Sequence, residues 1–314
     1  MPTERCAIVR RVRVVLAGGS GSLGRRVADD LASRGHNVVI LTRQPDLHLR
    51  HRTVTWDGRT DGPWMAELAG AALINLAGQL VDLRPTRRNI ELLTSSRVDP
   101  TLALVRAAAR LESPVPVWIQ MSTVAIYGDA GERVLTEDAP PASGPPQMAG
   151  VARAWEASSA NAHTDRKVIL RTSIVLDRES PALSRLTSLT RFGMGASAGT
   201  GQQWFSWIHV DDWLRIVRLI IEEPDDDLAP SGVLHATSPN PVRNRDLMSA
   251  MRKILRRPPV PRIPTPLVRA GALAMRTDPA LVLTGRWAVP ARLLRDGFHF
   301  EQPALEPALM DLLR

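Results

Sequence analysis

The apolar run at residues 12–17 leads directly into a glycine-rich turn, and this junction constrains the fold more than any other part of the sequence. Gly18, Gly21 and Gly24 follow the run at a spacing of three. A buried strand that ends in such glycines and restarts as a helix can hold a dinucleotide pyrophosphate, because the glycines permit a tight turn, close approach of the phosphates and close helix–strand packing. The N–H groups and dipole at the helix N-terminus attract the same anion. The turn therefore predicts a dinucleotide site.

The residues around the turn support this interpretation. Leu23, Val27 and Leu31 recur every four residues and so lie on one face of a helix. Gly35 is a stop signal for that helix, and the segment Asn37–Thr42 is a second apolar strand. Together these segments form a strand–turn–helix–strand unit of the length that a mononucleotide-binding half requires.

Strands and helices continue to alternate along the chain. Further strands are expected at Thr53–Trp56, Ala72–Leu76, Val117–Ser122 and Lys167–Val175, and helices at Thr101–Leu111 and Val151–Ala162. Such alternation predicts an α/β fold with a doubly wound parallel sheet of the Rossmann type and right-handed crossovers. Ligands of these sheets bind beyond the carboxyl ends of the strands, where the turn at 18–24, Ala77–Gly78 and Ser122–Thr123 are expected to converge.

The same pattern suggests how the chain divides. Residues 1–11 are expected to be a leader, and 12–176 with 208–237 the dinucleotide-binding domain. Residues 177–207 with 238–314 are expected to form a smaller substrate-side lobe with a C-terminal extension. The segment Asp211–Glu222 is expected to return to the main domain as a helix.

Composition excludes several classes of protein. The single cysteine, Cys6, excludes intramolecular disulfides and cysteine metal sites and suits a reducing cytoplasm. No apolar run approaches the roughly 20 residues of a membrane span. The net charge is +8, but arginines alternate with acids and only two lysines occur, so we expect no nucleic-acid partner. The seven histidines show no ligand spacing, so no metal site is expected.

The end of the second predicted strand indicates which nicotinamide dinucleotide is bound. NAD sites place an acid there for the ribose 2′-hydroxyl, whereas NADP sites place a basic residue for the 2′-phosphate. Here Thr42 and Arg43 end the strand, and no acid follows until Asp46. A guanidinium suits a phosphate, so the sequence predicts NADP (NADPH). The alternative is that Arg43 is a solvated surface arginine.

Several motifs resemble those of the extended short-chain dehydrogenase/reductases. They are the glycine turn, the segment 75–78, the segment 121–128 and Trp207–Asp212. The segments 95–98, 135–138, 153–156, 199–204, 239–241 and 289–298 narrow the resemblance to the atypical, epimerase-like subgroup with its own C-terminal extension. The resemblance covers nearly the whole chain from about residue 12.

The resemblance implies a role for particular residues. The pyrophosphate would lie at Gly18, Gly21, Ser22, Leu23 and Gly24; the 2′-phosphate at Thr42 and Arg43; and the adenosine ribose at Leu76, Ala77 and Gly78. Ser122 and Thr123 would lie beside the nicotinamide, with Thr123 at the position of the family's catalytic Ser or Thr. The strand from Arg171, including Ser173, would pass under the ring.

One departure from the family concerns its Tyr-x-x-x-Lys motif, in which the phenol handles the substrate proton and the lysine lowers its pKa. Met148 stands at the tyrosine position and Ala152 at the lysine position. Tyr127 is the only tyrosine, and Gly131 lies four residues after it. The usual proton relay is therefore absent.

The remaining candidates for catalysis are Thr123 and Tyr127. For Tyr127, a packing role at the end of its strand is the favoured alternative. For His209 we favour a structural role, because it leads into a helix that Asp211 or Asp212 is expected to cap.

Other side chains are expected around the substrate. Met148, Trp204 and Trp207 are candidates to line an apolar pocket, although packing between lobe and core explains the tryptophans as well. Glu137 and Asp138 are expected to solvate a proline-rich loop.

These observations predict an NADP(H)-binding oxidoreductase that acts on a small carbonyl, enol or imine substrate. One alternative is a nucleotide-binding sensor or scaffold without chemistry. A sugar-nucleotide epimerase or dehydratase is a weaker alternative, because that chemistry depends most on the missing base. A homodimer is compatible with this interpretation.

Overall fold

Seven parallel strands form the central sheet of the computed structural model, which describes residues 11–44, 50–223 and 229–313. The strands are β1 (Arg13–Ala17), β2 (Asn37–Thr42), β3 (Arg52–Thr55), β4 (Ala72–Asn75), β5 (Val115–Thr123), β7 (Thr164–Thr172) and β11 (Gly232–Ala236). Their order across the sheet is β3-β2-β1-β4-β5-β7-β11, which reverses direction at β1. The predicted doubly wound α/β fold is thereby confirmed. Cys6, Asp46 and most of the predicted leader lie outside the described residues.

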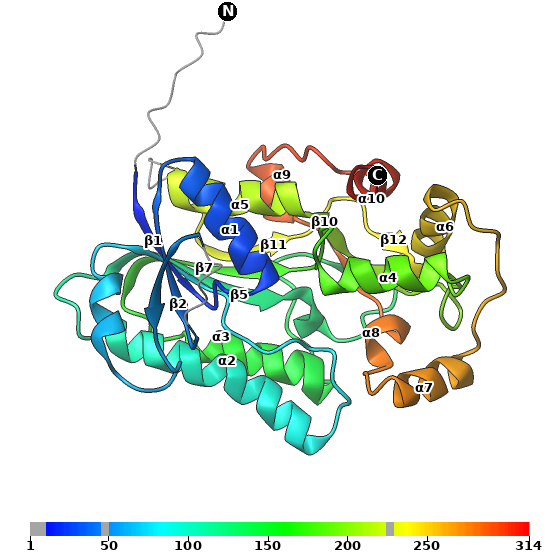
Figure 1. Cartoon of the computed structure of the whole chain (residues 1–314), viewed down its shortest axis with the longest axis horizontal. Coiled ribbons are helices and arrows are strands. Elements are labelled where there is room, and N and C mark those ends of the chain that lie inside the picture. Colours follow the sequence, from blue (N-terminus) through cyan, green and yellow to red (C-terminus); the bar gives the residue numbers. More distant parts are fainter. Residues whose placement is uncertain (1–10, 45–49, 224–228, 314) are drawn as a thin grey trace, which may run out of the picture.

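Helices cover both faces of this sheet (Figure 1). Helices α1 (Ser22–Ser33) and α5 (Val210–Glu222) pack together on one face, and α2 (Arg87–Ala108) and α3 (Val151–Ser158) on the other. Val27 and Leu31 of α1 are fully buried in the core and Leu23 packs against it, as the four-residue spacing predicted. Gly35 takes a positive φ of 87°, a conformation that glycine adopts without strain, and ends α1.

Two predicted elements differ from the structure, and one strand of the sheet was not predicted. Helix α2 begins at Arg87 rather than Thr101 and includes Pro100 in its interior. The last predicted strand is two strands, β7 and the short β8 (Ile174–Leu176). The seventh strand, β11, did not stand out in the sequence.

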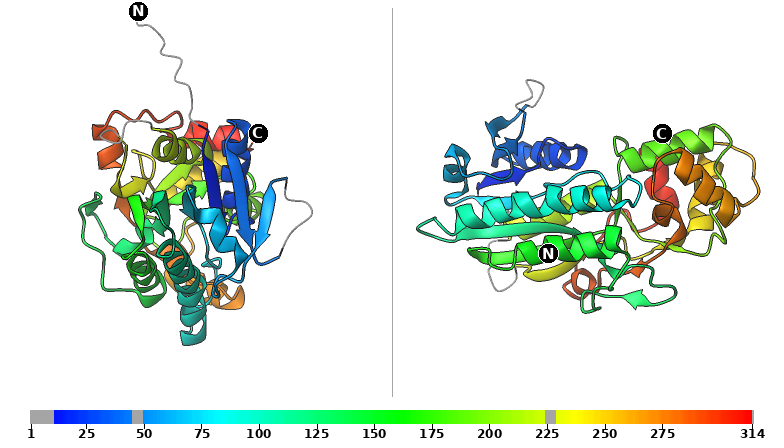
Figure 2. Two further views of the ribbon diagram at one scale, coloured as in Figure 1. Left: turned by 90° about the vertical axis from the view of Figure 1, so that its left-hand side faces the viewer. Right: turned by 90° about the horizontal axis from the view of Figure 1, so that it is seen from below.

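A second cluster of elements forms a lobe at one end of the sheet (Figure 2). Its elements are β9 (Trp204–Phe205), β12 (Val242–Arg243), α4 (Pro181–Arg191), α6 (Asn244–Ile254), α7 (Thr265–Ala274), α8 (Ala280–Leu283) and α10 (Leu305–Leu313). Apolar side chains of α4, α6 and α10 share a core with the buried Trp207 of β10 (Trp207–His209). Strand β10 pairs in parallel with β8, which connects the lobe to the end of β7.

Short elements join the lobe to the sheet. The turn η2 (Val124–Tyr127) and the π-helical turn η3 (Pro146–Gly150) follow β5, and β6 (Val134–Leu135) pairs with β13 (Trp287–Ala288) from the C-terminal region. The 3-10 turn η1 (Pro63–Leu68) lies beside α2. Helix α9 (Ala291–Arg295) packs against β11, so the chain returns to the main sheet after the lobe. Among the described residues, no helix has the length and apolar character needed to cross a bilayer.

Candidate functional site

Gly18 and Gly24 make close contacts in the turn that a larger residue would not permit. Gly18 has a positive φ of 80°, and a Cβ there would lie 2.8 Å from the backbone of Ala77. A Cβ on Gly24 would lie 2.6 Å from the Cα of Gly19, so the helix packs directly on its own turn. The structure therefore brings the end of β1 against the end of β4, as expected for a switch point in the strand order.

Gly21 is different, because the protein itself does not require a glycine there. It precedes α1 with an ordinary φ of −70°, and a Cβ would meet only the carbonyl oxygen of Gly18, at 3.6 Å. No side chain caps the helix, and its first turn, which includes Ser22 and Leu23, holds no acid. The N–H groups and positive dipole end of α1 thus face a space that a side chain would narrow. These residues fit a pyrophosphate.

The end of β2 presents a cation beside this turn. Thr42 is buried, and its Oγ1 donates to the carbonyl oxygen of Gln44 at 3.0 Å. Arg43 is exposed and makes no hydrogen bond or ion pair with any residue in the described part of the chain. An exposed guanidinium here is available to an anionic ligand.

A buried arginine supports the segment after β4, where Leu76, Ala77 and Gly78 lie. The guanidinium of Arg97 would be 3.1 Å from a Cβ on Gly78, and it donates to the carbonyl oxygens of Leu93 and Gln79. It also lies over the ring of Trp155. Burial lowers the pKa of Arg97 to about 10, and none of its described contacts is an ion pair. The positive charge of Arg97 lies beside Gly78, in the segment that follows β4.

Asn75 fixes the same segment from the other side. Its side-chain amide donates to Thr101 and Gln120, and its Oδ1 accepts from the N–H of Ala77 at 3.2 Å. Asn75 and Arg97 were recognised as parts of motifs, but their supporting roles depend on contacts across the fold that spacing does not show.

A chain of buried polar groups begins at the end of β5. Ser122 donates to Glu156 at 2.6 Å, and Glu156 accepts two hydrogen bonds from Arg171, each of 2.9 Å. Arg171 also donates to the hydroxyl of Tyr127 at 2.7 Å. The Tyr127 hydroxyl lies 2.6 Å from Nε2 of His235. Burial opposes the charge of Arg171, but the pairing with Glu156 raises its pKa overall.

The far end of this chain reaches the C-terminal region. His235 donates from Nδ1 to the carbonyl oxygen of Val289 at 2.9 Å, so its Nε2 accepts the proton of Tyr127. Glu137 is buried and accepts backbone N–H bonds from His235 and Arg292. Glu137 therefore joins β11 to α9 rather than solvating a loop.

The two catalytic candidates lie in different environments. Tyr127 is 1% exposed, and burial raises its pKa above the ordinary value for a phenol. Its hydroxyl is fully engaged, which favours the packing interpretation. Thr123 is partly exposed, and its Oγ1 accepts from the N–H of Ala125 at 3.1 Å. The hydroxyl proton of Thr123 remains available to another acceptor.

The positions of the missing Tyr–Lys pair are both buried. Met148 lies in η3, where its Sδ contacts the guanidinium of Arg286. Ala152 is 1% exposed and packs in an apolar cluster with Val124 and Ile126. A lysine at this position would extend from a buried backbone site into apolar surroundings.

The two tryptophans that were candidates to line the substrate pocket lie in different surroundings. Trp204 is partly exposed and packs against Trp287, with ring centroids 4.2 Å apart. Trp207 is fully buried and donates from its indole to Asn240, so it belongs to the core of the lobe and does not line a pocket. Ser173 is buried and bonded to the carbonyl oxygen of Ala236.

His209 caps α5 itself, which corrects the expectation that Asp211 or Asp212 does so. Its Nδ1 accepts from the N–H of Asp211 at 3.2 Å. Asp212 is instead fully buried and accepts from the backbone N–H groups of Glu301 and Gln302. Both residues thus have structural roles, as favoured for His209.

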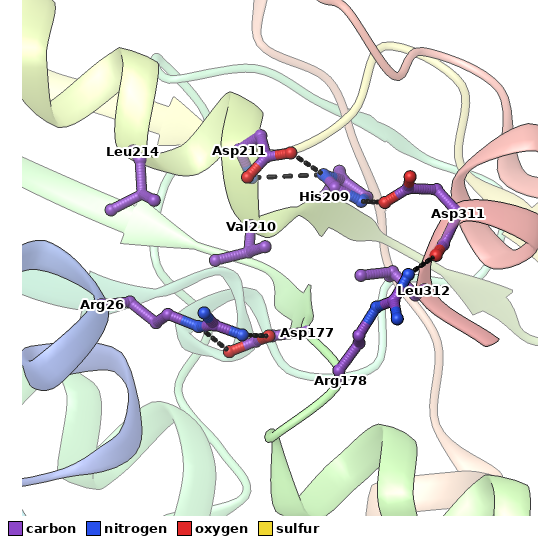
Figure 3. A pocket seen from close by; sticks show the side chains of 9 residues that line it. All are labelled: Arg26, Asp177, Arg178, His209, Val210, Asp211, Leu214, Asp311 and Leu312. Carbon is purple, nitrogen blue, oxygen red and sulfur yellow. Dashed lines mark hydrogen bonds and ion pairs between the residues drawn. The ribbon is translucent and has the colours of Figure 1, made fainter. Parts of the chain in front are cut away.

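His209 also lies at a cavity of about 140 Å³ between α1, α5 and α10 (Figure 3). Atoms of His209, Asp211 and Asp311 lie within 4.8 Å of one another there, a cluster that spacing did not reveal because Asp311 is remote in sequence. Since Nδ1 of His209 accepts a hydrogen bond, the neutral ring carries its proton on Nε2, which faces Asp311 at 3.3 Å. That nitrogen makes no hydrogen bond with any described residue, and in this tautomer it has no lone pair to offer a metal ion.

Comparisons with known proteins agree with this architecture. Residues 14–233 match the model of the NAD dependent epimerase/dehydratase family, and residues 263–312 match a domain of unknown function, DUF1731. Over 317 residues the chain is 31% identical to epimerase family protein SDR39U1 of Mus musculus, covering 96% of this chain and 100% of the relative. It is 30% identical to epimerase family protein YfhF of Bacillus subtilis, with coverage of 96% and 98%. The crystal structure of human SDR39U1 (isoform2) with NADPH superposes with a TM-score of 0.81 at 26% identity, covering 96% of this chain and 98% of that one.

Proposed function

This chain belongs to the NAD dependent epimerase/dehydratase family, and from that premise we propose that it is a cytoplasmic NADP(H)-dependent oxidoreductase. Its substrate is a small carbonyl, enol or imine compound. The observation that carries the proposal is the open space at Gly21, at the uncapped start of α1, with the exposed Arg43 at the end of the neighbouring strand.

The cofactor assignment follows from these residues. The turn from Gly18 to Gly24 would hold the pyrophosphate on backbone N–H groups, and Arg43 would pair with the 2′-phosphate. The segment Leu76–Gly78 would lie along the adenosine ribose, supported from below by Arg97. The NADPH in the human relative's crystal structure supports the choice of NADP.

The proposed chemistry divides between cofactor and protein. When bound, the nicotinamide supplies or accepts the hydride. Thr123 holds the substrate oxygen through its free hydroxyl proton, whereas the hydroxyl of Ser122 already donates a hydrogen bond to Glu156. The hydrogen bonds that join Ser122, Glu156 and Arg171 would hold these side chains in place beside the site. We assign no side chain of the described residues to the place of the missing phenol, so the proton comes from water or from the substrate.

The missing pair also favours the second candidate function, an NADP(H)-binding sensor or scaffold that performs no chemistry. Both positions of the pair are filled by buried apolar side chains, Met148 and Ala152. Epimerisation or dehydration of a nucleotide sugar is less well supported, because general acid–base assistance contributes about 10²–10⁴-fold and is needed most there.

Transfer of a hydrogen label distinguishes the two candidates. We expect the protein, incubated with C4-deuterated NADPH and a small-molecule extract of its source cells, to move deuterium into a product that mass spectrometry detects. Gly21→Val should abolish transfer, because the added side chain fills the pyrophosphate space. Gly271→Val is the control, since a side chain at that position meets nothing within 4 Å. Binding of NADPH without any label transfer would overturn the oxidoreductase proposal in favour of the sensor.

A further inference from the structure

A segment of the C-terminal region, residues 284–287, runs between the end of β5 and the lobe. Gly285 donates to Asp129 at 3.0 Å and accepts from the N–H of Ala130 at 3.1 Å. The N–H of Arg286 donates to the carbonyl oxygen of Trp204 at 3.1 Å. These backbone bonds hold Arg286 between the turn that follows Thr123 and the substrate-side residue Trp204.

The side chain of Arg286 has a weak set of partners. Its Nη2 lies 3.1 Å from Sδ of Met148 and 3.1 Å from Oγ1 of Thr284. The Thr284 hydroxyl donates its own proton to Ala280. Nε of Arg286 is buried and has no hydrogen-bond partner among the described residues. A thioether and a hydroxyl are poor partners for a full positive charge.

No carboxylate compensates this charge within the described residues. Asp129 is the acid that acts on it electrostatically, but it makes no ion pair with Arg286 and its Oδ1 is bonded to Gly285. Burial lowers the pKa of Arg286 to about 10, against the opposing effect of Asp129. By contrast, the buried Arg171 is held by both oxygens of Glu156. The fold thus pairs one of these two arginines fully and leaves the other without an anion.

The contact with Met148 shows where in the fold the guanidinium of Arg286 lies. Met148 stands at the position of the tyrosine that handles the substrate proton in the resembled family, and η3 packs against η2, the turn that begins after Thr123. The rings of Trp204 and Trp287 pack together beside Arg286. Trp287 follows Arg286 in the chain, and Trp204 accepts its backbone hydrogen bond. An unpaired guanidinium therefore lies where the substrate of the proposed enzyme would bind.

We propose that Arg286 binds a carboxylate of the substrate, so that the compound acted on is a small carboxylic acid rather than a neutral ketone. A planar guanidinium pairs with a carboxylate through two parallel N–H bonds, and a partly buried site strengthens that pair. The proposal rests on the proposed function, because it places the substrate beside Met148 and Thr123.

Malonate is a suitable probe, with its neutral diamide, malonamide, as the matched compound. We expect malonate, titrated into NADPH-loaded protein, to bind saturably and change tryptophan fluorescence, and malonamide not to bind. Arg286→Met should lower malonate affinity at least tenfold. Arg153→Met is the control, because it removes the same charge from an exposed arginine of α3 whose hydrogen bond, among the described residues, is to the carbonyl oxygen of Ser143. Its affinity should stay within twofold of wild type.

A second measurement needs no variant. Phenylglyoxal modifies accessible arginines, and peptide mass spectrometry reads the modification at each site. Malonate should protect Arg286 and leave Arg153 unprotected. Equal modification of Arg286 with and without malonate, or equal malonate affinity in the wild type and Arg286→Met, would overturn the assignment. NADPH affinity is measured in the same samples: intact NADPH binding without malonate binding contradicts only the carboxylate inference, whereas loss of NADPH binding in the wild type contradicts the proposed function.

Discussion

At the scale of single residues, Tyr127 illustrates how packing decides the role of a reactive side chain. Its hydroxyl accepts from Arg171 and donates to His235 inside the protein. Tyr127→Phe removes one hydrogen bond of buried Arg171 and leaves Nε2 of His235 without its donor, so we expect the free energy of unfolding, measured by urea denaturation, to fall by about 1–3 kcal/mol. NADPH affinity should not change. Once a native substrate is found, Thr123→Ala should reduce turnover more than Tyr127→Phe; a Tyr127→Phe variant of normal stability and no activity would contradict this account.

His235 provides a pH-dependent test of the same buried chain. Burial lowers its pKa, opposed by Glu137, while Arg171 acts in the same direction as burial. The unfolded chain binds a proton on this histidine below about pH 6.5, whereas the folded protein resists it. The free energy of unfolding should therefore fall as pH decreases through about 6.5. The slope of this fall should correspond to the uptake of at most one proton on unfolding.

The control for this dependence is a neutral replacement. His235→Gln cannot take up a proton, so its unfolding free energy, measured by urea denaturation between pH 7.5 and 5.5, should decline less steeply than that of wild type. His51→Gln, at a more exposed histidine, should leave the contribution of His235 in place. An identical slope in wild type and His235→Gln would show that His235 does not resist protonation.

At the scale of elements, the start of α1 separates a glycine that the fold needs from one that a ligand needs. Gly24→Ala places a Cβ 2.6 Å from Gly19, so we expect a loss of about 1–3 kcal/mol in unfolding free energy. Gly21→Ala meets only Gly18, at 3.6 Å, and should cost less than about 1 kcal/mol, the effect of alanine at a helix cap. Calorimetry should show at least tenfold weaker NADPH binding for Gly21→Ala. Unchanged NADPH affinity in that variant would place the phosphate site elsewhere.

The turn η3 changes what can be expected from restoring the family's motif. A double change, Met148→Tyr with Ala152→Lys, would place the family's two residues back at these positions. The structure starts the helix with a π-helical turn and packs Ala152 against Val124 and Ile126. An ammonium there would be buried among apolar side chains, so we expect the double variant to be destabilised rather than active.

The central elements could be predicted because their signals are local. Leu23, Val27 and Leu31 define one helical face, and Gly18 marks the turn without reference to the rest of the chain. Helix α2 was predicted from Thr101, but it begins at Arg87 and continues through Pro100. The roles of Arg97, Glu137 and Arg286 depend on partners 18 or more residues away, as with Arg97 and Gln79, and no local pattern reports such contacts.

At the scale of the whole molecule, Asp212 connects the main domain to the chain that leads into α10. Its two carboxylate oxygens accept the N–H groups of Glu301 and Gln302 at 2.8 and 2.9 Å. Asp212→Asn retains one acceptor of the two, so we expect faster hydrogen exchange at residues 301–302 and a loss of about 1.5–3 kcal/mol in unfolding free energy. Asp211→Asn, at the exposed neighbour, is the control and should change neither; equal effects of both variants would remove Asp212 from this role.

The account as a whole depends on NADP(H) binding at the junction of β1, α1 and β2. Calorimetric titration of the wild-type protein and of Arg43→Ala with NADPH and NADH tests that claim most directly. We predict that the wild type binds NADPH at least tenfold more tightly than NADH, a difference of about 1.4 kcal/mol, and that Arg43→Ala loses most of this difference. Equal affinities for the two nucleotides in the wild type would contradict the account.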